Sequence, residues 1–285
     1  NLPLRDGVPV ETGVLAGLDP TEITDPQPLA VAIRNFITEH DLSRRLAATF
    51  AVVVDGGGLL PLHRLLADIR LLAIRQEGAL FWRILLGGTT GTGLPLGLVA
   101  DKDAKTCVTL ILARIAAMEK PVRGRELDAE EVRNWLAPLL LGDVVSYAPM
   151  QPLPYGLLPL TGGEKAATRI GIPFGQCSTE MLIELGRQAE TTGIKMLRPA
   201  IDHSIVFFGD ENACRTMIGF SKDLILSEND PRSKIAACPG KPACNSASFK
   251  THDLGDLAAR ENADLLDGSF TLHLSGCSKG CAHPA

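Results

Sequence analysis

Four cysteines in two short clusters near the end of the sequence constrain this chain more than any other feature. The first cluster reads CPGKPAC at 238–244, and the second reads SGCSKGCAHP at 275–284. Each pair lies among glycines and prolines, residues that favour tight turns and close backbone approach. A [4Fe–4S] cluster takes one cysteine per iron. The sequence therefore predicts that one such cluster is bound by Cys238, Cys244, Cys277 and Cys281.

Other roles for these cysteines fit the pattern less well. Four-cysteine zinc sites usually contain C-x2-C pairs, whereas the spacings here are C-x5-C and C-x3-C. Disulfide bonds need an oxidising compartment, which nothing in the sequence indicates. A non-catalytic zinc module held by the same four thiolates stays open as an alternative.

Length, charge and hydropathy exclude several classes of protein. The chain has 285 residues, enough for two domains, and a net charge of −5 argues against general nucleic-acid binding. No apolar run reaches the roughly 18 residues that a membrane span needs. Seven cysteines, four of them clustered, fit the reducing cytoplasm. We expect a cytoplasmic protein that binds neither nucleic acid nor a membrane, and a fragment of a longer one, because the sequence starts at Asn1 without a methionine.

Periodicity and turn residues predict alternating helices and strands. Helices are expected at 30–40, 102–118, 128–140, 178–192 and 211–219, and strands at 1–10, 48–54, 80–86, 168–173 and 203–208. Asp128 is the expected N-cap of its helix. A proline-rich linker at 149–160 is expected to separate a first repeat, 1–148, from a second, 161–285. Within the second, a ferredoxin-like half-domain (161–220) precedes the cysteine lobe (221–285).

The two halves share identical residues at a constant offset of 189 positions, with no gap. At this offset, eight residues of the first half are identical to Ala236, Ala237, His252, Leu254, Phe270, Leu274, Gly276 and Gly280. The positions that correspond to the four cysteines carry Thr49, Asp55, Gly88 and Thr92 in the first half. This pattern predicts a pseudo-twofold α+β protein with a degenerate first lobe that lacks the cluster. Pockets commonly form at such interfaces, so a cleft between the halves is expected.

The cysteine motif resembles the iron–sulfur signature of sirohaem sulfite and nitrite reductases. Longer stretches of the sequence resemble one branch of that superfamily, precorrin-3B synthase of aerobic cobalamin biosynthesis. These stretches are AACPGKPAC, LSGCSKGCAHP, NLPLRDGV (1–8), AVVVDGGG (51–58), IGIPFGQ (170–176) and LRPA (197–200). The resemblance implies a nitrite/sulfite reductase-like fold and a monooxygenase that converts precorrin-3A to precorrin-3B with dioxygen, by hydroxylation and γ-lactone formation. Electrons would pass through the cluster from a donor protein or a reduced nicotinamide source. A sirohaem-dependent sulfite or nitrite reductase is the alternative.

A tetrapyrrole substrate would present many carboxylates, which arginine binds efficiently through charge-assisted hydrogen bonds. The candidate substrate-binding residues are Arg198, the favoured one, with Arg5, Arg70, Lys279 and His283. Thr49 stands where related enzymes carry lysine, which puts a basic anion-binding role at this position in doubt.

The resemblance also implies a mononuclear non-haem iron, a metal that often uses two histidines and a carboxylate. No spacing identifies its ligands among His63, His203, His252, His273 and His283, and each histidine is expected to have an ordinary structural role. The three remaining cysteines lack partners in the sequence and are expected in the core: Cys107, Cys177 and Cys214.

Overall fold

The computed structural model describes residues 7–142, 153–162, 165–220 and 223–282. The chain divides into two compact units, unit 1 from Asn1 to Gln151 and unit 2 from Pro152 to Ala285. The division falls inside the stretch expected as a linker, 149–160, but the end of that stretch forms strand β6 (Gly156–Pro159). Among the described residues, no helix has the length and apolar character to cross a bilayer.

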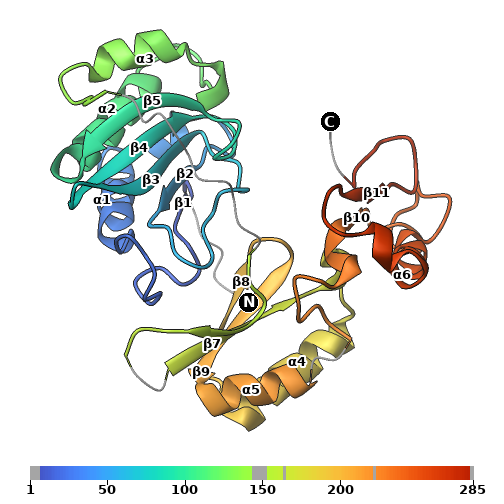
Figure 1. The fold of residues 1–285 in the computed structure, drawn as a ribbon. Helices are drawn as coiled ribbons and strands as arrows, with labels where there is room; N and C mark the ends of the chain where they lie inside the picture. The colour runs from blue at the N-terminus through green and yellow to red at the C-terminus, as the bar shows by residue number, and fades with distance from the viewer. Residues whose placement is uncertain (1–6, 143–152, 163–164, 221–222, 283–285) are drawn as a thin grey trace. The chain divides into compact units, whose positions relative to one another are not determined.

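Unit 1 is built on a five-stranded sheet with strands in chain order (Figure 1). The strands are β1 (Val10–Glu11), β2 (Val52–Asp55), β3 (Ile69–Gln76), β4 (Ala79–Leu86) and β5 (Leu94–Ala100). The first three pair in parallel, and β3, β4 and β5 pair antiparallel. The β3–β4 hairpin turns through two residues with positive φ, Glu77 and Gly78, as a tight hairpin turn requires. Strand β4 ends at Leu86, the predicted residue, and two glycines with positive φ follow it, Gly87 and Gly88.

Three helices accompany this sheet: α1 (Gln27–Glu39), α2 (Ala104–Ala116) and α3 (Ala129–Leu136). Helix α2 buries Cys107, Ile111 and Ile115, which recur every four residues and so face one side. The side chain of Asp128 accepts a hydrogen bond from the backbone N–H of Glu130, which confirms the predicted N-cap. The helices predicted in this unit are therefore present, and each ends before the last residue that the periodicity predicted.

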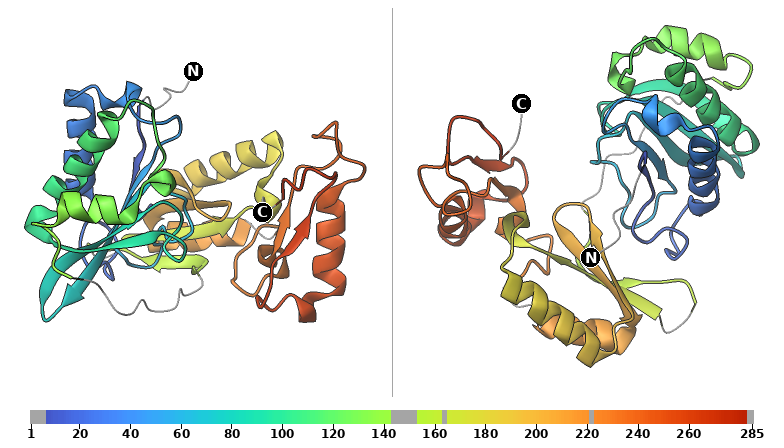
Figure 2. Two further views of the ribbon diagram at one scale, coloured as in Figure 1. Left: turned by 90° about the horizontal axis from the view of Figure 1, so that it is seen from above. Right: turned by 180° about the vertical axis from the view of Figure 1, so that it is seen from behind.

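Unit 2 begins with an antiparallel four-stranded sheet in the order β6-β7-β9-β8. Its strands are β6, β7 (Lys165–Gly171), β9 (Ser204–Asp210) and β8 (Met196–Ala200), with helices α4 (Thr179–Thr192) and α5 (Glu211–Phe220). The two helices lie side by side against one face of the sheet (Figures 1 and 2). The β7–α4–β8–β9–α5 order matches the ferredoxin-like pattern expected from the sequence.

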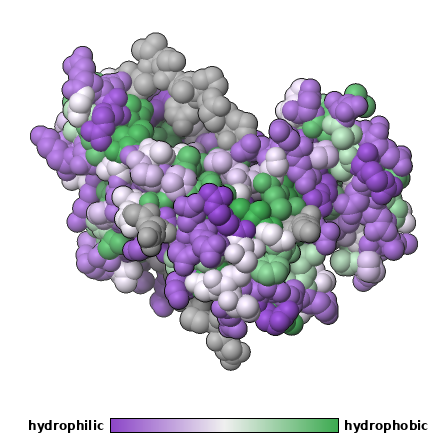
Figure 3. Space-filling view, turned by 60° about the horizontal axis from the view of Figure 1, so that its bottom comes forward, coloured by the Kyte–Doolittle hydropathy of each residue, from purple (hydrophilic) through white to green (hydrophobic). Residues whose placement is uncertain are grey.

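The cysteine lobe follows, with a parallel pair of short strands, β10 (Ile235–Ala237) and β11 (Leu272–Leu274), joined through helix α6 (Thr251–Glu261). Among the described residues, the lobe contributes three buried members to its hydrophobic cluster, Ile235, Ala259 and Leu266, and Phe174 of the half-domain completes it. Figure 3, which draws one face of the whole chain, shows apolar areas among the hydrophilic surface. In this lobe the large hydrophobic residues that remain exposed are Phe249, Leu254, Leu257, Leu265 and Phe270. The lobe therefore has little apolar burial of its own to stabilise it.

The gapless repeat predicted from the sequence does not match the secondary structure. Moved back by 189 positions, α6 falls on residues 62–72, a loop followed by the start of β3. Leu274 of β11 lies in a parallel pair, whereas its counterpart Leu85 lies in β4, which pairs antiparallel on both sides.

Candidate functional site

The parallel pairing of β10 and β11 brings the two cysteine clusters side by side. Both strands end at the same edge, because Ala237 is in register with Leu274. Cys238 extends the ladder by donating its backbone N–H to the carbonyl of Leu274 at 3.0 Å. We call the segments that follow the strands the first cysteine loop (238–249) and the second cysteine loop (275–282). Residues far apart in the sequence thus meet because two short strands share a register.

Three further contacts join the cysteine loops. Gly276 donates its backbone N–H to the sulfur of Cys238 at 3.2 Å, and its carbonyl accepts the N–H of Ser248 at 2.8 Å. The ammonium of Lys279 lies 3.4 Å from the hydroxyl of Ser246. Both loops are therefore anchored to each other around Cys238 and Gly276.

The surroundings of Cys238 favour the thiolate, the form of cysteine that binds iron. The backbone N–H of Gly276 is the main cause of a lowered pKa for this thiol, with further contributions from Gly240 and Thr251. Burial opposes the shift without cancelling it. Two cysteines outside the loops behave oppositely, because burial raises the pKa of Cys107 to about 12 and that of Cys214 to about 11. Both are core residues as predicted, whereas Cys177 is only half-buried.

The other loop cysteines are more open than Cys238. Cys244 and Cys277 are half-buried, and Cys281 is exposed. Within the described ranges, no three His, Cys, Asp or Glu side chains are grouped so that they could hold a metal ion. A cube binds one thiolate at each iron, so its ligands stand apart rather than meet at one atom. The four thiols on adjoining loops therefore match a cluster in donor chemistry, while their side chains do not gather around one point.

Glycines are needed where the cysteine loops pack most closely. Gly276 is buried, and a Cβ at this position would lie 2.7 Å from that of Ala247. Gly240 has a φ of +59°, and a Cβ there would overlap the hydroxyl of Thr251. These two positions explain why glycine accompanies cysteine in the sequence motif.

The predicted substrate-binding residues lie in different surroundings. Arg198 is half-buried in β8, with its guanidinium 5.3 Å from the centre of the Phe208 ring. Lys279 is exposed on the second cysteine loop. Arg70 is fully buried in β3 and donates to the carbonyls of Leu62 and Leu65, a geometry that gives it a structural role and leaves no surface for a ligand. Arg5 and His283 lie outside the described residues.

Among the described histidines, His252 is the one found next to a predicted cluster ligand. Its ring lies 5.1 Å from the ring of Phe174, and its neighbour Thr251 donates a hydrogen bond to the Cys238 carbonyl. Burial lowers the pKa of His252, and its Nε2 atom is buried without a hydrogen-bond partner. Sequence reasoning did not single out this histidine, because no spacing connects residue 252 with the cysteine motif.

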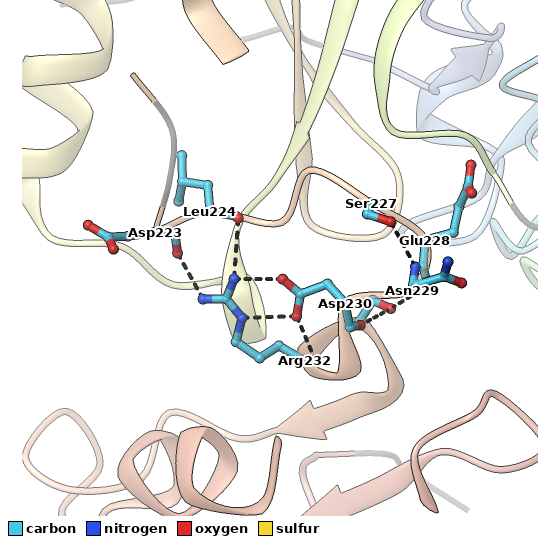
Figure 4. A network of polar contacts seen from close by, with 8 residues as sticks. Asp223, Leu224, Ser227, Glu228, Asn229, Asp230 and Arg232 are labelled. Carbon is cyan, nitrogen blue, oxygen red and sulfur yellow. Dashed lines mark hydrogen bonds and ion pairs between the residues drawn. The ribbon is translucent and has the colours of Figure 1, made fainter. Parts of the chain in front are cut away.

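A polar network fixes the segment that leads into β10 (Figure 4). Arg232 pairs with the carboxylate of Asp230 at 2.6 Å, which raises the pKa of the guanidinium, and donates to the carbonyls of Asp223 and Leu224. A cavity of about 510 Å³ adjoins this network and is lined also by Asp256 and Arg260 of α6. The network therefore ties the first residues of the cysteine lobe, Asp223 and Leu224, to the segment that enters β10.

Comparison with known proteins agrees with the cysteine motif. A precorrin-3B synthase from Sinorhizobium sp is 32% identical over 286 residues, which cover 99% of this chain and 61% of the relative. The chain is similar to this precorrin-3B synthase over nearly its whole length. This finding confirms the resemblance predicted from the sequence. No family model matches the chain.

Two more distant proteins are also similar to the chain. A ferredoxin–nitrite reductase from Synechococcus elongatus is 23% identical over 303 residues, covering 95% of this chain and 59% of the relative. The solved structure of the Mycobacterium tuberculosis NirA protein superposes with a TM-score of 0.71 at 16% identity, covering 98% of this chain and 56% of that one. This likeness confirms the predicted α+β fold. The chain spans about three fifths of the length of the curated relatives it matches.

Proposed function

We propose that this chain is the cluster-binding portion of a precorrin-3B synthase, an oxidoreductase that converts precorrin-3A to precorrin-3B by oxygen-dependent hydroxylation and γ-lactone formation. The homology supports the family assignment. The observation that carries the cluster is the adjacency of the two cysteine loops, with Gly276 bound to the sulfur of Cys238. The proposal also includes dioxygen, an electron source (a donor protein or reduced nicotinamide) and a mononuclear non-haem iron. We assign no residues to their binding.

In this proposal Cys238, Cys244, Cys277 and Cys281 hold a [4Fe–4S] cluster, which supplies one-electron transfer when bound. The N–H of Gly276 is directed at one ligand sulfur, where it stabilises negative charge. The surroundings of Cys238 lower the pKa of its thiol and so favour the thiolate, the form that binds iron.

The small core of the cysteine lobe gives independent support. A two-stranded sheet with one helix is marginal alone, and small lobes of this kind are commonly stabilised by a metal centre. In the described part of the chain, the lobe's hydrophobic cluster has three buried residues of its own and one from the half-domain, Phe174. Coordination by thiolates on two loops would supply the missing stabilisation.

Arg198 and Lys279 remain in the proposal as residues that bind substrate carboxylates, since neither is held in the interior. The pseudo-twofold relation also remains, in a different register from the one predicted. The parallel pair β2–β3 in unit 1 and the pair β10–β11 in unit 2 each have a glycine-containing turn after the first strand, at Gly56 and Gly240. We propose that these pairs are the counterparts, and that unit 1 lost or never had the thiolates.

Iron and acid-labile sulfide assays with an absorption spectrum test the cluster. The reconstituted protein is expected to be brown with equal amounts of iron and sulfide, and both Cys244→Ser and Cys277→Ser are expected to lose the cluster and destabilise unit 2. Cys177→Ser is the matched control, because this half-buried cysteine lies outside the cysteine loops. A full complement of iron and sulfide in either loop variant, or zinc without sulfide in the wild type, would contradict the proposal.

Substrate binding is tested with uroporphyrin, a tetrapyrrole that carries many carboxylates. Arg198→Ala should weaken its binding with the cluster intact, whereas Arg187→Ala, an exposed arginine paired with Glu184, should not. Unchanged affinity in the first variant would remove Arg198 from the site.

A sirohaem-dependent reductase is the second candidate, favoured by the match to a ferredoxin–nitrite reductase. It predicts a tightly bound haem-like chromophore in the purified protein. A spectrum with cluster absorption alone would support precorrin-3B synthase over this alternative.

A further inference from the structure

The hydrophobic core of the cysteine lobe is completed by a side chain from outside the lobe. Phe174 follows β7 in the half-domain, yet it belongs to the same buried cluster as Ile235 of β10 and Ala259 of α6. Only 9% of Phe174 is exposed. The half-domain therefore supplies part of the core to a lobe that has little apolar burial of its own.

The contact between Phe174 and α6 is so close that only glycine fits beneath the ring. The tip of the ring lies over Gly255, where a Cβ would come within 2.7 Å of Cζ and 2.9 Å of Cε1. His252, three residues earlier, has its ring 5.1 Å from that of Phe174. Residues three apart lie on one face of a helix, so Phe174 packs on a single face of the first turns of α6.

The half-domain also fixes the backbone that carries this ring. Phe174 has a left-handed φ of +56°, a conformation that a bulky residue adopts only where its surroundings hold it. The next residue, Gly175, packs against His203, since a Cβ there would lie 2.5 Å from Nδ1 of the imidazole. Ile172 donates its N–H to the His203 carbonyl at 2.7 Å. The turn that carries Phe174 is thus anchored on the β8–β9 hairpin.

The same end of α6 holds the first of the four predicted cluster ligands. Thr251, the first residue of the helix, is completely buried, and its hydroxyl donates to the Cys238 carbonyl at 2.5 Å. The sulfur of this cysteine accepts the N–H of Gly276. A shift of α6 would therefore change the geometry of the N–H···S bond. Contacts run without a gap from Phe174 through α6 to the backbone of Cys238.

We propose that Phe174 is a positioning residue for Cys238: the half-domain fixes α6 with this ring, and α6 fixes the cysteine whose sulfur meets the N–H of Gly276. The inference rests on the proposed role of Cys238 as a cluster ligand. Hydrogen bonds to ligand sulfurs tune the reduction potential of a cluster. A determinant of that potential therefore lies outside the cysteine lobe, in a residue that does not touch iron.

The first test uses the protein without a cluster, so it does not depend on iron uptake. Amide hydrogen exchange of α6 is measured by mass spectrometry, with α5 as the reference for the half-domain. Phe174→Leu should speed the exchange of α6 on the order of tenfold, because loss of buried ring atoms leaves a cavity beside Gly255, and α5 should be unchanged. Phe50→Leu is the matched control, because Phe50 is fully buried in the core of unit 1, and it should leave α6 unchanged.

An exchange of size between the two residues separates direct contact from general loss of stability. Gly255→Ala adds a methyl group at the place that Phe174→Leu empties. Alanine also favours a helix over glycine, but this contribution is the same in both backgrounds and cancels in a double-mutant cycle. Gly255→Ala should protect α6 about fivefold more in the Phe174→Leu background than in the wild type. Equal effects in the two backgrounds, or a wild-type α6 that exchanges like an unfolded peptide, would overturn the inference.

The second test uses the reconstituted protein and a potentiometric titration followed by electron paramagnetic resonance. Phe174→Leu should keep its iron and sulfide and lower the midpoint potential, because a weaker N–H···S bond stabilises the reduced, more negative cluster less. Adding Gly255→Ala should return the potential toward that of the wild type. Lower stability with an unchanged potential would make Phe174 an ordinary core residue and overturn the inference.

Two further outcomes are also decisive. If Phe174→Leu binds no iron, recovery of iron in the double variant supports the inference, and failure to recover it counts against the inference. Absence of a cluster in the wild type would instead overturn the proposed function, while the hydrogen-exchange cycle would still decide whether Phe174 holds α6.

Discussion

Gly276 donates its backbone N–H to the sulfur of Cys238 across the two cysteine loops, at 3.2 Å. This bond requires the backbone at 276 to pass directly over Ala247, with no room for a side chain. The glycine before the third cysteine is therefore part of the site, because it allows the approach that directs an N–H at a ligand sulfur.

Gly276→Ala should separate the cysteine loops. The added Cβ would lie 2.7 Å from that of Ala247, well inside van der Waals contact, and overpacking of this kind costs about 1–3 kcal/mol. We expect lower resistance to denaturant and less bound iron per chain, measured together on the reconstituted protein. Gly219→Ala in α5 is the control, because a Cβ there meets open space, and it should leave the iron content unchanged without lowering the resistance to denaturant. Wild-type iron content in Gly276→Ala would show that the contact is dispensable.

The sequence was sufficient to predict the helices whose polar and apolar faces differ clearly. Helix α4 runs from Thr179 to Thr192 beside the predicted 178–192, and Ser178 caps it through its hydroxyl. Helix α6 was missed because its exposed face carries Leu254 and Leu257 and its middle contains Gly255, so the periodicity that marks a surface helix is weak.

Strands and buried charges were harder to predict for a related reason. Strand β3 is buried along most of its length, so its apolar residues do not alternate with polar ones, and Arg70 interrupts them. An arginine in a family-like stretch indicated a ligand-binding residue, yet its donors satisfy loop carbonyls. The cysteine loops could be predicted because the spacing of the cysteines indicates a metal cluster. The contact between His252 and Phe174 depends on tertiary packing, which no spacing in the sequence reveals.

Thr49 adopts a left-handed backbone with a φ of +63°, which is costly for a β-branched residue. Its hydroxyl accepts a hydrogen bond at 2.9 Å from Arg123, which also pairs with Asp68. Thr49→Gly and Thr49→Ala both lose this bond, but only glycine is relieved of the strain. Thr49→Gly should therefore be more stable than Thr49→Ala by about 1 kcal/mol in urea denaturation. Equal stabilities would contradict the strained conformation.

Glu22 should make stability depend on pH near neutrality. Burial raises its pKa from 4.5 to about 7, with nearby Asp19, Asp25 and Asp55 adding to the shift. A carboxyl whose pKa is higher in the folded state stabilises that state fully below pH 4.5, and this stabilisation is lost as the pH rises through about 7. Glu22→Gln cannot ionise, so it should gain stability relative to the wild type at pH 8 and lose that advantage at pH 4. Thermal unfolding across this range measures the difference, and parallel curves would contradict the raised pKa.

Arg169 should be the most sensitive charged residue of the half-domain. It is fully buried, donates to the hydroxyl of Ser204 and the carbonyl of Leu153, and stacks 4.1 Å over the ring of Tyr155. Arg169→Met keeps the aliphatic stem but leaves these acceptors buried and unpaired, which should cost about 3–5 kcal/mol of unfolding free energy. Arg187→Met, which removes only an exposed pair with Glu184, should cause no measurable change. Guanidinium denaturation followed by far-ultraviolet circular dichroism compares the two, and similar midpoints would mean that water or a backbone shift satisfies the acceptors left by Arg169.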